Sequence, residues 1–279
     1  MHNWDWHRDP QNRSYLTCSL LQDWQHGFFT KLWAAPPESL VSTFDLFSTR
    51  ASLEPSLPVY RLKQVHGNRV VAAADLEPVA EAANPALVEA DGLVSTTAGQ
   101  TVWVCTADCT PVLIGDVATG QVAAIHAGWR GTALQIVPET IAKLQAQGSR
   151  TEDLRIAMGP AIAGEVYQVS TTVAAQVGAS LLDEVEAPEL QDLTADAVEQ
   201  ILQKLQELPE SPVLDDPQPG RARLDVRMVN QLQIARLGIA AEQVAIAPYC
   251  TYQTPDLFFS YRRESKKQVQ WSGIVSQVR

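Results

Sequence analysis

The chain has 279 residues, of which 46% are hydrophobic, so it is long enough to bury a core without disulfide or metal staples. It carries 32 acidic and 21 basic residues, and the formal net charge of −11 argues against nucleic acids and anionic membranes as partners, because both attract a basic surface. Small anionic substrates need only local positive charge and are compatible with this balance.

The N-terminal region predicts little regular structure. Residues 1–26 carry scattered aromatic residues and are expected to form an irregular extension, followed by a strand around Phe28–Thr30 and a helix over Glu38–Phe47. Met1–Trp6 lacks the basic and apolar pattern of a secretory signal, and no apolar run approaches the roughly 18 residues of a membrane span. We therefore expect a cytoplasmic protein whose four cysteines are free thiols.

The densest apolar part of the chain begins after residue 58. Residues 59–71 are expected to form a strand, a turn at His66-Gly67-Asn68 and a second strand, and residues 76–90 a surface loop with some helix. Three short runs rich in β-branched residues follow, and their nearly continuous apolar character predicts strands buried on both faces. They are Val102–Cys105, Pro111–Ile114 and Val122–Ile125, the last two joined by Asp116–Gly120 as a hairpin loop.

The remaining elements alternate irregularly. Strands outnumber helices, so the pattern predicts a single α/β domain over residues 1–279, with mixed β-sheets flanked by helices. Pro138 is expected to kink the helix that contains it or to shift its start. We expect helices over Gly131–Leu144, Thr194–Leu208 and Leu224–Leu237, strands over Leu154–Met158 and Val244–Ala247, a loop over Pro209–Gly220 and a final strand to Val278.

Two of the apolar runs lie next to residues that can bind metal. Cys109 and His126 adjoin predicted strands, and His66 lies in the upstream turn. A thiolate and two imidazoles suit Zn²⁺, and three protein ligands leave the fourth position open, as in catalytic zinc sites. Such an ion would lower the pKa of a bound water to near 7. Spacing alone does not establish that the three side chains meet.

Other interpretations of these residues remain open. Cys109 with either histidine could form a thiol nucleophile and its base, and a Cys-His₂ set is also found in blue-copper sites. A multicopper oxidase needs many further histidines, however, and the chain has five in all. The simplest alternative is a buried structural cysteine and two histidines in turns.

Two segments could hold an anion. Gly128-Trp129-Arg130-Gly131 precedes a predicted helix, whose first N–H groups together with Arg130 could bind phosphate, although such glycines more often only permit a tight turn. The aromatic and basic segment Phe258–Arg263 could add further contacts, although a solvated basic edge strand is its simpler interpretation.

Together these segments resemble the YfiH/DUF152 family, whose members are described variously as laccase-like polyphenol oxidase, peptidoglycan editing factor and purine nucleoside phosphorylase. The resemblance extends from about Gly27 to Val275. It rests on Gln64–Gly67, Ala90–Val94, Thr106–Leu113, His126–Thr132, Gly159–Ile162, Leu224-Asp225 and Asp256–Arg263.

The resemblance implies a single α/β domain and a metal site, normally zinc, at His66, Cys109 and His126. It also implies phosphorolysis of purine nucleosides (adenosine, inosine, guanosine or methylthioadenosine) and hydrolytic deamination of adenosine. Copper-dependent phenol oxidation and a cysteine hydrolase acting on peptidoglycan are the alternative activities, and a monomer or small homo-oligomer is expected. The matching positions give Gln64, Asp91, Arg130 and Arg262 as candidate contacts to nucleoside or phosphate.

The sequence departs from the family pattern in two places. Family members commonly carry Gly-Pro-Cys-Cys-Tyr-Glu-Val, where this chain has Gly164–Val169, without the extra thiols and with Glu165 and Gln168 in that region. A glycine-rich segment after the first strand is replaced by Lys31–Ala35. Both departures bear on substrate range and activity more than on the metal ligands.

Overall fold

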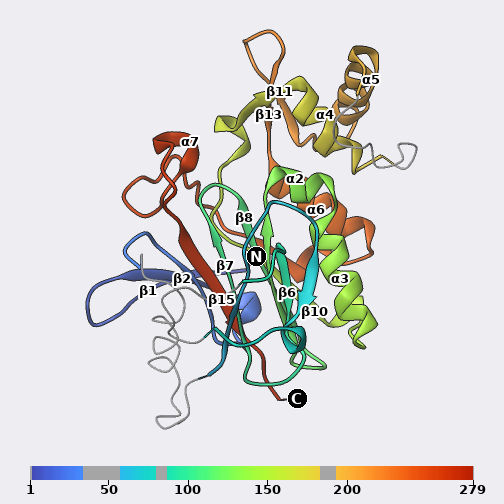
Figure 1. Ribbon diagram of the computed structural model, residues 1–279. Coiled ribbons are helices and arrows are strands. Elements are labelled where there is room, and N and C mark those ends of the chain that lie inside the picture. The colour runs from blue at the N-terminus through green and yellow to red at the C-terminus, as the bar shows by residue number, and fades with distance from the viewer. Residues whose placement is uncertain (1, 34–56, 80–86, 183–192, 279) are drawn as a thin grey trace.

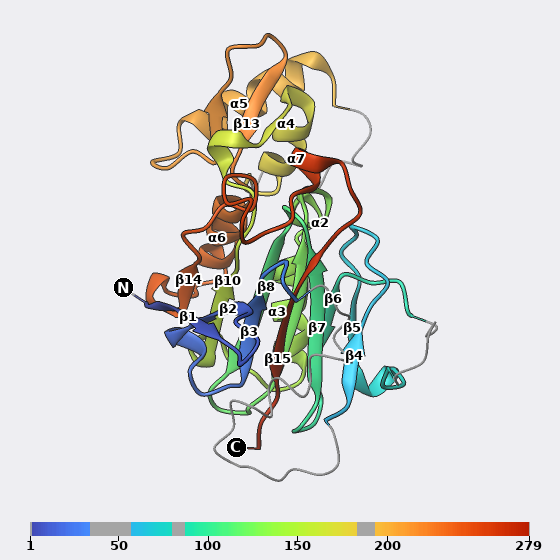
Figure 2. The same cartoon turned by 90° about the vertical axis from the view of Figure 1, so that its left-hand side faces the viewer.

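The computed structural model describes residues 2–33, 57–79, 87–182 and 193–278. Two six-stranded sheets stack face to face, and a three-stranded sheet with two helices extends from one end of this pair (Figures 1 and 2). This arrangement confirms the predicted α/β fold with mixed sheets flanked by helices. The predicted helix over residues 38–47 lies outside the described residues. No helix in the described ranges is long and apolar enough to cross a membrane.

The first sheet includes the N-terminal residues, so the predicted irregular extension over residues 1–26 is wrong. Trp4 and Trp6 alternate with polar residues and pack against the core between the sheets, while Asp5 and His7 are exposed. This alternation with a period of two is typical of an edge strand that has one buried face and one solvent-exposed face. In spatial order the strands are β1 (Trp4–Arg8), β2 (Ser14–Cys18), β3 (His26–Phe29), β15 (Gln270–Val275), β7 (Thr101–Thr106) and β4 (Val59–Arg61).

Two of the three strands predicted from the continuous apolar runs lie in the second sheet, β8 (Thr110–Asp116) and β9 (Val122–Ala127), whereas the third is β7 of the first sheet. The predicted hairpin is confirmed, because β8 and β9 pair in antiparallel register on either side of residues 117–121. In spatial order its strands are β14 (Val244–Ile246), β10 (Leu154–Met158), β8 (Thr110–Asp116), β9 (Val122–Ala127), β6 (Gly92–Val94) and β5 (Val70–Ala72).

Alternate residues of these strands enter two different cores. On β8, Leu113 faces the first sheet, whereas Val112 and Ile114 pack beneath helices on the other face. Burial on both faces explains why the strands lack polar alternation. Pro138 falls in the first turn of its helix, where a missing N–H leaves no hydrogen bond unmade. The helices beside this sheet are α2 (Trp129–Ala133), α3 (Ile136–Ala146) and α6 (Val226–Arg236).

The smaller sheet and its helices lie at the top of Figure 2. The predicted loop over residues 209–220 contains a strand, and Leu224 ends another strand instead of starting a helix, because Asp225 caps α6 through Arg227 N and Met228 N. The basic C-terminal segment forms a four-residue helix, not an edge strand. The elements are β11 (Gln168–Ser170), β13 (Arg221–Leu224), β12 (Val213–Asp215), α4 (Thr171–Ala179), α5 (Ala195–Gln206) and, near the site, α7 (Tyr261–Glu264).

The chain crosses from the first sheet to the second at two connections. One links β4 to β5 and the other links β7 to β8, so β4 and β5 do not pair although both strands were predicted. Because β4 and β7 are parallel, their C-terminal ends lie at the same end of the first sheet, and both connections start there. Each contains a non-glycine residue with positive φ, His66 at 62° and Asp108 at 93°. Such backbone is uncommon outside glycine and is often found at functional sites.

Candidate metal centre and active site

The two connections bring the predicted metal ligands together. His66 lies in the first connection, Cys109 in the second and His126 near the end of β9. One ligand atom from each residue lies within 4.8 Å of the other two, an arrangement that could hold a metal ion. The two imidazole rings are nearly perpendicular, with centroids 4.6 Å apart. His66 is exposed and His126 is buried, so the group opens toward solvent on one side.

Strand register explains why Gly128 adjoins this group. Thr110 pairs with Ala127 across β8 and β9, so Cys109 and Gly128 face each other one position further along. A Cβ placed on Gly128 would lie 2.9 Å from Cys109 Sγ and 3.3 Å from His66 Cδ2. The absence of a side chain at Gly128 therefore makes room for two of the three ligands.

Gly128→Ala is expected to weaken zinc binding by at least about tenfold, because the new methyl group displaces the thiol or the imidazole. Gly67→Ala is the matched control, since a Cβ placed there would come no closer than 3.8 Å to a neighbouring side chain, that of Asp91 or Val65. Competition with a chelator would measure both affinities. Equal affinities in the two variants would contradict this account of Gly128.

Asp91 organises two of the ligands from a fully buried position. It neighbours His126 across β6 and β9, and its Oδ1 accepts a 2.7 Å hydrogen bond from His126 Nδ1, which leaves Nε2 for a metal. The same carboxylate accepts the backbone N–H groups of Val65, His66 and Gly67 at 2.8–3.1 Å. One side chain thus fixes both the orientation of His126 and the turn that carries His66.

The ligands also shift one another's protonation. Burial raises the pKa of the Cys109 thiol, but the charge of His126 and hydrogen bonds from His126 and His66 outweigh burial and lower that pKa to about 6. Burial acts to lower the pKa of His126, whereas the Cys109 thiolate and Asp91 raise it. The pair therefore favours a thiolate beside a protonated imidazole, and a bound cation would displace the imidazole proton.

Gln64 supports the first connection from the side of the first sheet. Its Nε2 donates to Cys105 O at 2.7 Å, and its Oε1 accepts from Cys105 N at 2.8 Å. Both ends of the amide therefore bind backbone next to the strand end that leads to Cys109. Neither Gln64 nor Asp91 was predicted in this supporting role, because sequence does not reveal a backbone partner.

Two arginines lie beside the pocket next to Cys109. The pocket has a volume of about 30 Å³ and is lined in part by Trp129 and Tyr167. The guanidinium of Arg130 lies 4.3 Å from the Trp129 ring centroid, and that of Arg262 lies 4.6 Å from the Tyr167 ring centroid. Both arginines are exposed, so at the rim of the pocket a positively charged guanidinium lies against each aromatic ring. Tyr167 was not predicted as a site residue.

Charge at this rim also acts on Tyr167. Burial and the Cys109 thiolate raise the pKa of its phenol to about 12, while Arg262 and Arg130 act in the opposite direction. The phenol therefore stays protonated near neutral pH. Both arginines that were predicted to bind an anion therefore lie close enough to Tyr167 to act on its pKa.

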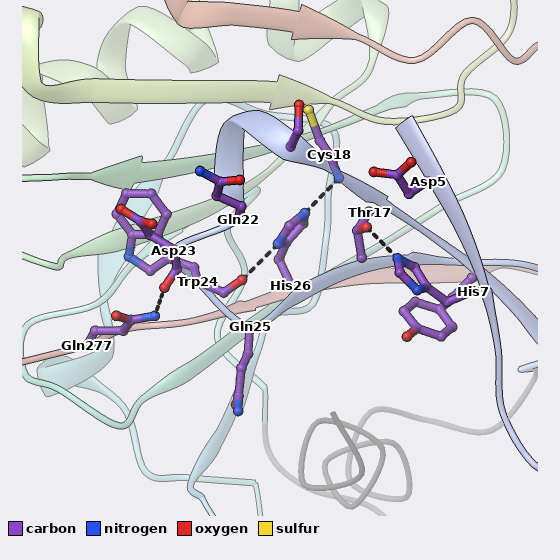
Figure 3. A pocket seen from close by; sticks show the side chains of 12 residues that line it. Asp5, His7, Thr17, Cys18, Gln22, Asp23, Trp24, Gln25, His26 and Gln277 are labelled. Carbon is purple, nitrogen blue, oxygen red and sulfur yellow. Dashed lines mark hydrogen bonds between the residues drawn. The ribbon is translucent and has the colours of Figure 1, made fainter. Parts of the chain in front are cut away.

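A larger cavity of about 570 Å³ is lined by residues of the first three strands, by the segment between β2 and β3 and by Gln277, and by none of the proposed metal ligands (Figure 3). His26 lies in it with both ring nitrogens engaged, because Nε2 accepts from Cys18 N and Nδ1 donates to Trp24 O, each at 2.9 Å. Burial lowers the pKa of His26 to about 4, so it is neutral. His26 is therefore a structural histidine.

Comparisons with known proteins agree with this architecture. A family model described as multi-copper polyphenol oxidoreductase laccase matches residues 36–276. A Synechocystis sp. protein named purine nucleoside phosphorylase is 48% identical over 98% of this chain and 97% of its own length. A Bacillus subtilis protein named purine nucleoside phosphorylase YlmD is 31% identical over 73% of this chain and 65% of its own length.

Solved structures share the fold at low sequence identity. YlmD from Geobacillus stearothermophilus superimposes with a TM-score of 0.72 at 21% identity, covering 98% of both chains. A Bacillus licheniformis protein, YfiH, gives a TM-score of 0.71 at 24% identity, covering 98% of this chain and 99% of its own. With the family model and the close relative in agreement, the predicted resemblance is confirmed: the chain belongs to the YfiH/DUF152 family.

Proposed function

We propose that the chain is a zinc-dependent purine nucleoside phosphorylase that also deaminates adenosine. The observation that carries the proposal is an open Cys-His₂ group beside two arginines supported on aromatic rings. The names of the relatives support the phosphorylase part of this proposal. A site of this kind can bind an anion and a metal next to each other, as phosphorolysis at a metal centre requires.

The donor set fits zinc. His66, Cys109 and His126 would hold the ion, and the depressed pKa of the Cys109 thiol favours the thiolate that a metal needs. When bound, zinc supplies a Lewis acid at the mouth of the pocket. Asp91 keeps His126 in the tautomer whose free nitrogen can bind, because it accepts the proton of Nδ1.

Phosphate would bind at the rim through Arg262, with Arg130 as a second contact. Arg262 also donates to Gln168 O at 2.7 Å, which fixes the guanidinium while it lies over Tyr167. Phosphate held there would attack the ribose carbon that bears the purine, forming the new C–O bond as the C–N bond to the base breaks. The 30 Å³ pocket has room for about one water molecule, so base and ribose would lie across the open rim.

Copper-dependent phenol oxidation is the alternative suggested by the family description. The histidines outside the triad argue against a multicopper cluster built by this chain alone. Within the described residues, His2 bonds to Glu242 O, His7 bonds to Thr17 Oγ1 and His26 is internally satisfied. All three lie at the N-terminal strands.

A cysteine hydrolase is the second alternative, because the thiolate of Cys109 beside His126 also suits a nucleophile. The two functions differ in their response to chelation. A hydrolase would keep its activity without metal, and substrate would protect Cys109 from alkylation.

The test is to incubate the purified, zinc-loaded protein with adenosine, with and without inorganic phosphate, and to identify the products by chromatography. We expect adenine only with phosphate, inosine independently of phosphate, and loss of both products after chelation. Restoration by zinc but not by copper would support the metal assignment. No product from adenosine, inosine, guanosine or methylthioadenosine would overturn the proposal, as would activity that survives complete removal of metal.

A further inference from the structure

Asp108, the residue before Cys109, has a buried carboxylate that the mechanism above does not use. Among the described residues, the hydrogen-bond donors to this carboxylate all come from the C-terminal segment. Oδ1 accepts from Thr251 Oγ1 at 2.7 Å, and Oδ2 accepts from Ser260 Oγ at 3.0 Å and from the backbone N–H of Arg262 at 2.7 Å. Segments more than 140 positions apart in sequence are thereby joined at one carboxylate.

The same residue is joined to the wall of the pocket. Its backbone carbonyl accepts from Ile162 N at 2.9 Å, at the start of the loop that leads to Tyr167. Its φ of 93° turns the chain between β7 and β8, so that the carboxylate and the following thiol both lie at the edge of the site. Asp108 therefore contacts both segments that hold the Arg262 guanidinium in place.

Arg262 depends on this anchor because its helix is only four residues long. Ser260 caps α7 by accepting from Arg263 N, and its hydroxyl is oriented by donating to Asp108. Besides the Asp108 bond, α7 is held by the Arg262 bond to Gln168 O and by Arg263, which donates to Thr251 O, Tyr252 O and Phe258 O within the same segment. The bond from Arg262 N to Asp108 links α7 directly to the residue that precedes Cys109.

We propose that Asp108 is a positioning residue that sets the place of Arg262 relative to Cys109, and with it the affinity for phosphate. The proposal rests on the proposed function, in which Arg262 contacts phosphate. Asp108 itself does not touch the reacting atoms. Within the part of the chain that the structure describes, the carboxylate is held by neutral donors, one of which is the backbone N–H of Arg262 itself.

The test is Asp108→Asn, which keeps the shape of the side chain and is tolerated at positive φ, but presents an N–H₂ group to donors. The KM for phosphate should rise by about tenfold or more, with kcat at saturating phosphate and zinc content close to those of the wild type. Adding Arg262→Ala should give no further rise in KM. Additive effects, or a fall in kcat with unchanged KM, would overturn the proposal.

Two further measurements keep the outcome decisive. If Asp108→Asn fails to fold, Thr251→Val removes one donor and should raise the phosphate KM in the same direction. If the wild type itself shows no phosphorolysis, the proposed function fails, and the anchoring role is then tested by hydrogen exchange. Faster exchange of residues 260–264 in Asp108→Asn, but not in Asp116→Asn, would support it, and equal exchange would contradict it.

Discussion

Replacing His126 with alanine is expected to abolish zinc binding and to lower nucleoside phosphorolysis by about 1,000-fold, or about 4 kcal/mol of transition-state stabilisation. The buried imidazole is one of the three proposed ligands, and the two that remain, from exposed or half-exposed positions, would not hold the ion tightly. Elemental analysis and product formation would be measured on the same preparation.

The matched control is His7→Ala, which removes an imidazole from a surface strand where its recorded bond is to Thr17 Oγ1. This variant should keep its metal and its turnover. Circular dichroism would check that both variants are folded, since His126→Ala also removes one of the donors to buried Asp91. Full metal content and full activity in His126→Ala would refute the assignment of the site.

Asp91→Asn is expected to weaken zinc binding by about 10- to 100-fold, the range seen when an outer partner of a metal-binding histidine is lost. The carboxylate receives four hydrogen bonds, whereas an amide has one oxygen and would direct its N–H₂ group at backbone N–H groups or at His126. Both the His66 turn and the His126 ring would therefore lose their fixed positions. The variant should also unfold at lower temperature.

Asp116→Asn provides the comparison, because Asp116 is equally buried at the opposite end of β8 and makes its recorded bonds through Oδ1 to Ala118 N and Thr119 N. An asparagine can keep those bonds. Chelator competition and thermal melts of the two variants would be compared side by side. An Asp91→Asn protein with wild-type zinc affinity would show that Asp91 does not orient the ligands.

The sequence predicted the second sheet well because its strands are buried on both faces. Leu113 and its neighbours form an uninterrupted apolar run, bounded by turn residues at Asp116–Gly120. The predicted strand around Phe28–Thr30 corresponds to β3, but β1 and β2 were missed. On β1, Trp4 and Trp6 alternate with polar residues over only five positions, a short signal on an edge strand. Aromatic residues in an apparently irregular segment were in fact the inward face of a strand.

The convergence of the metal ligands came from family resemblance and not from spacing. Residues 62–69 look like an ordinary connection between neighbouring strands, and nothing local indicates that β4 and β5 belong to different sheets. Only long-range pairing, such as that of β4 with β7, decides where the connection goes. The roles of Gln64 and Asp91 depend on that same pairing, because their partners are backbone groups of distant segments.

Because of the two connections between the sheets, metal binding would also stabilise the folded chain. His66 and Cys109 lie in these connections and His126 lies in the second sheet, so an ion held by all three closes loops in the chain that are open when it unfolds. A ligand that binds only the folded chain adds about 4 kcal/mol to its stability at 1,000 times its dissociation constant. The supply of free metal would then govern how long the protein survives proteolysis, as well as whether it is active.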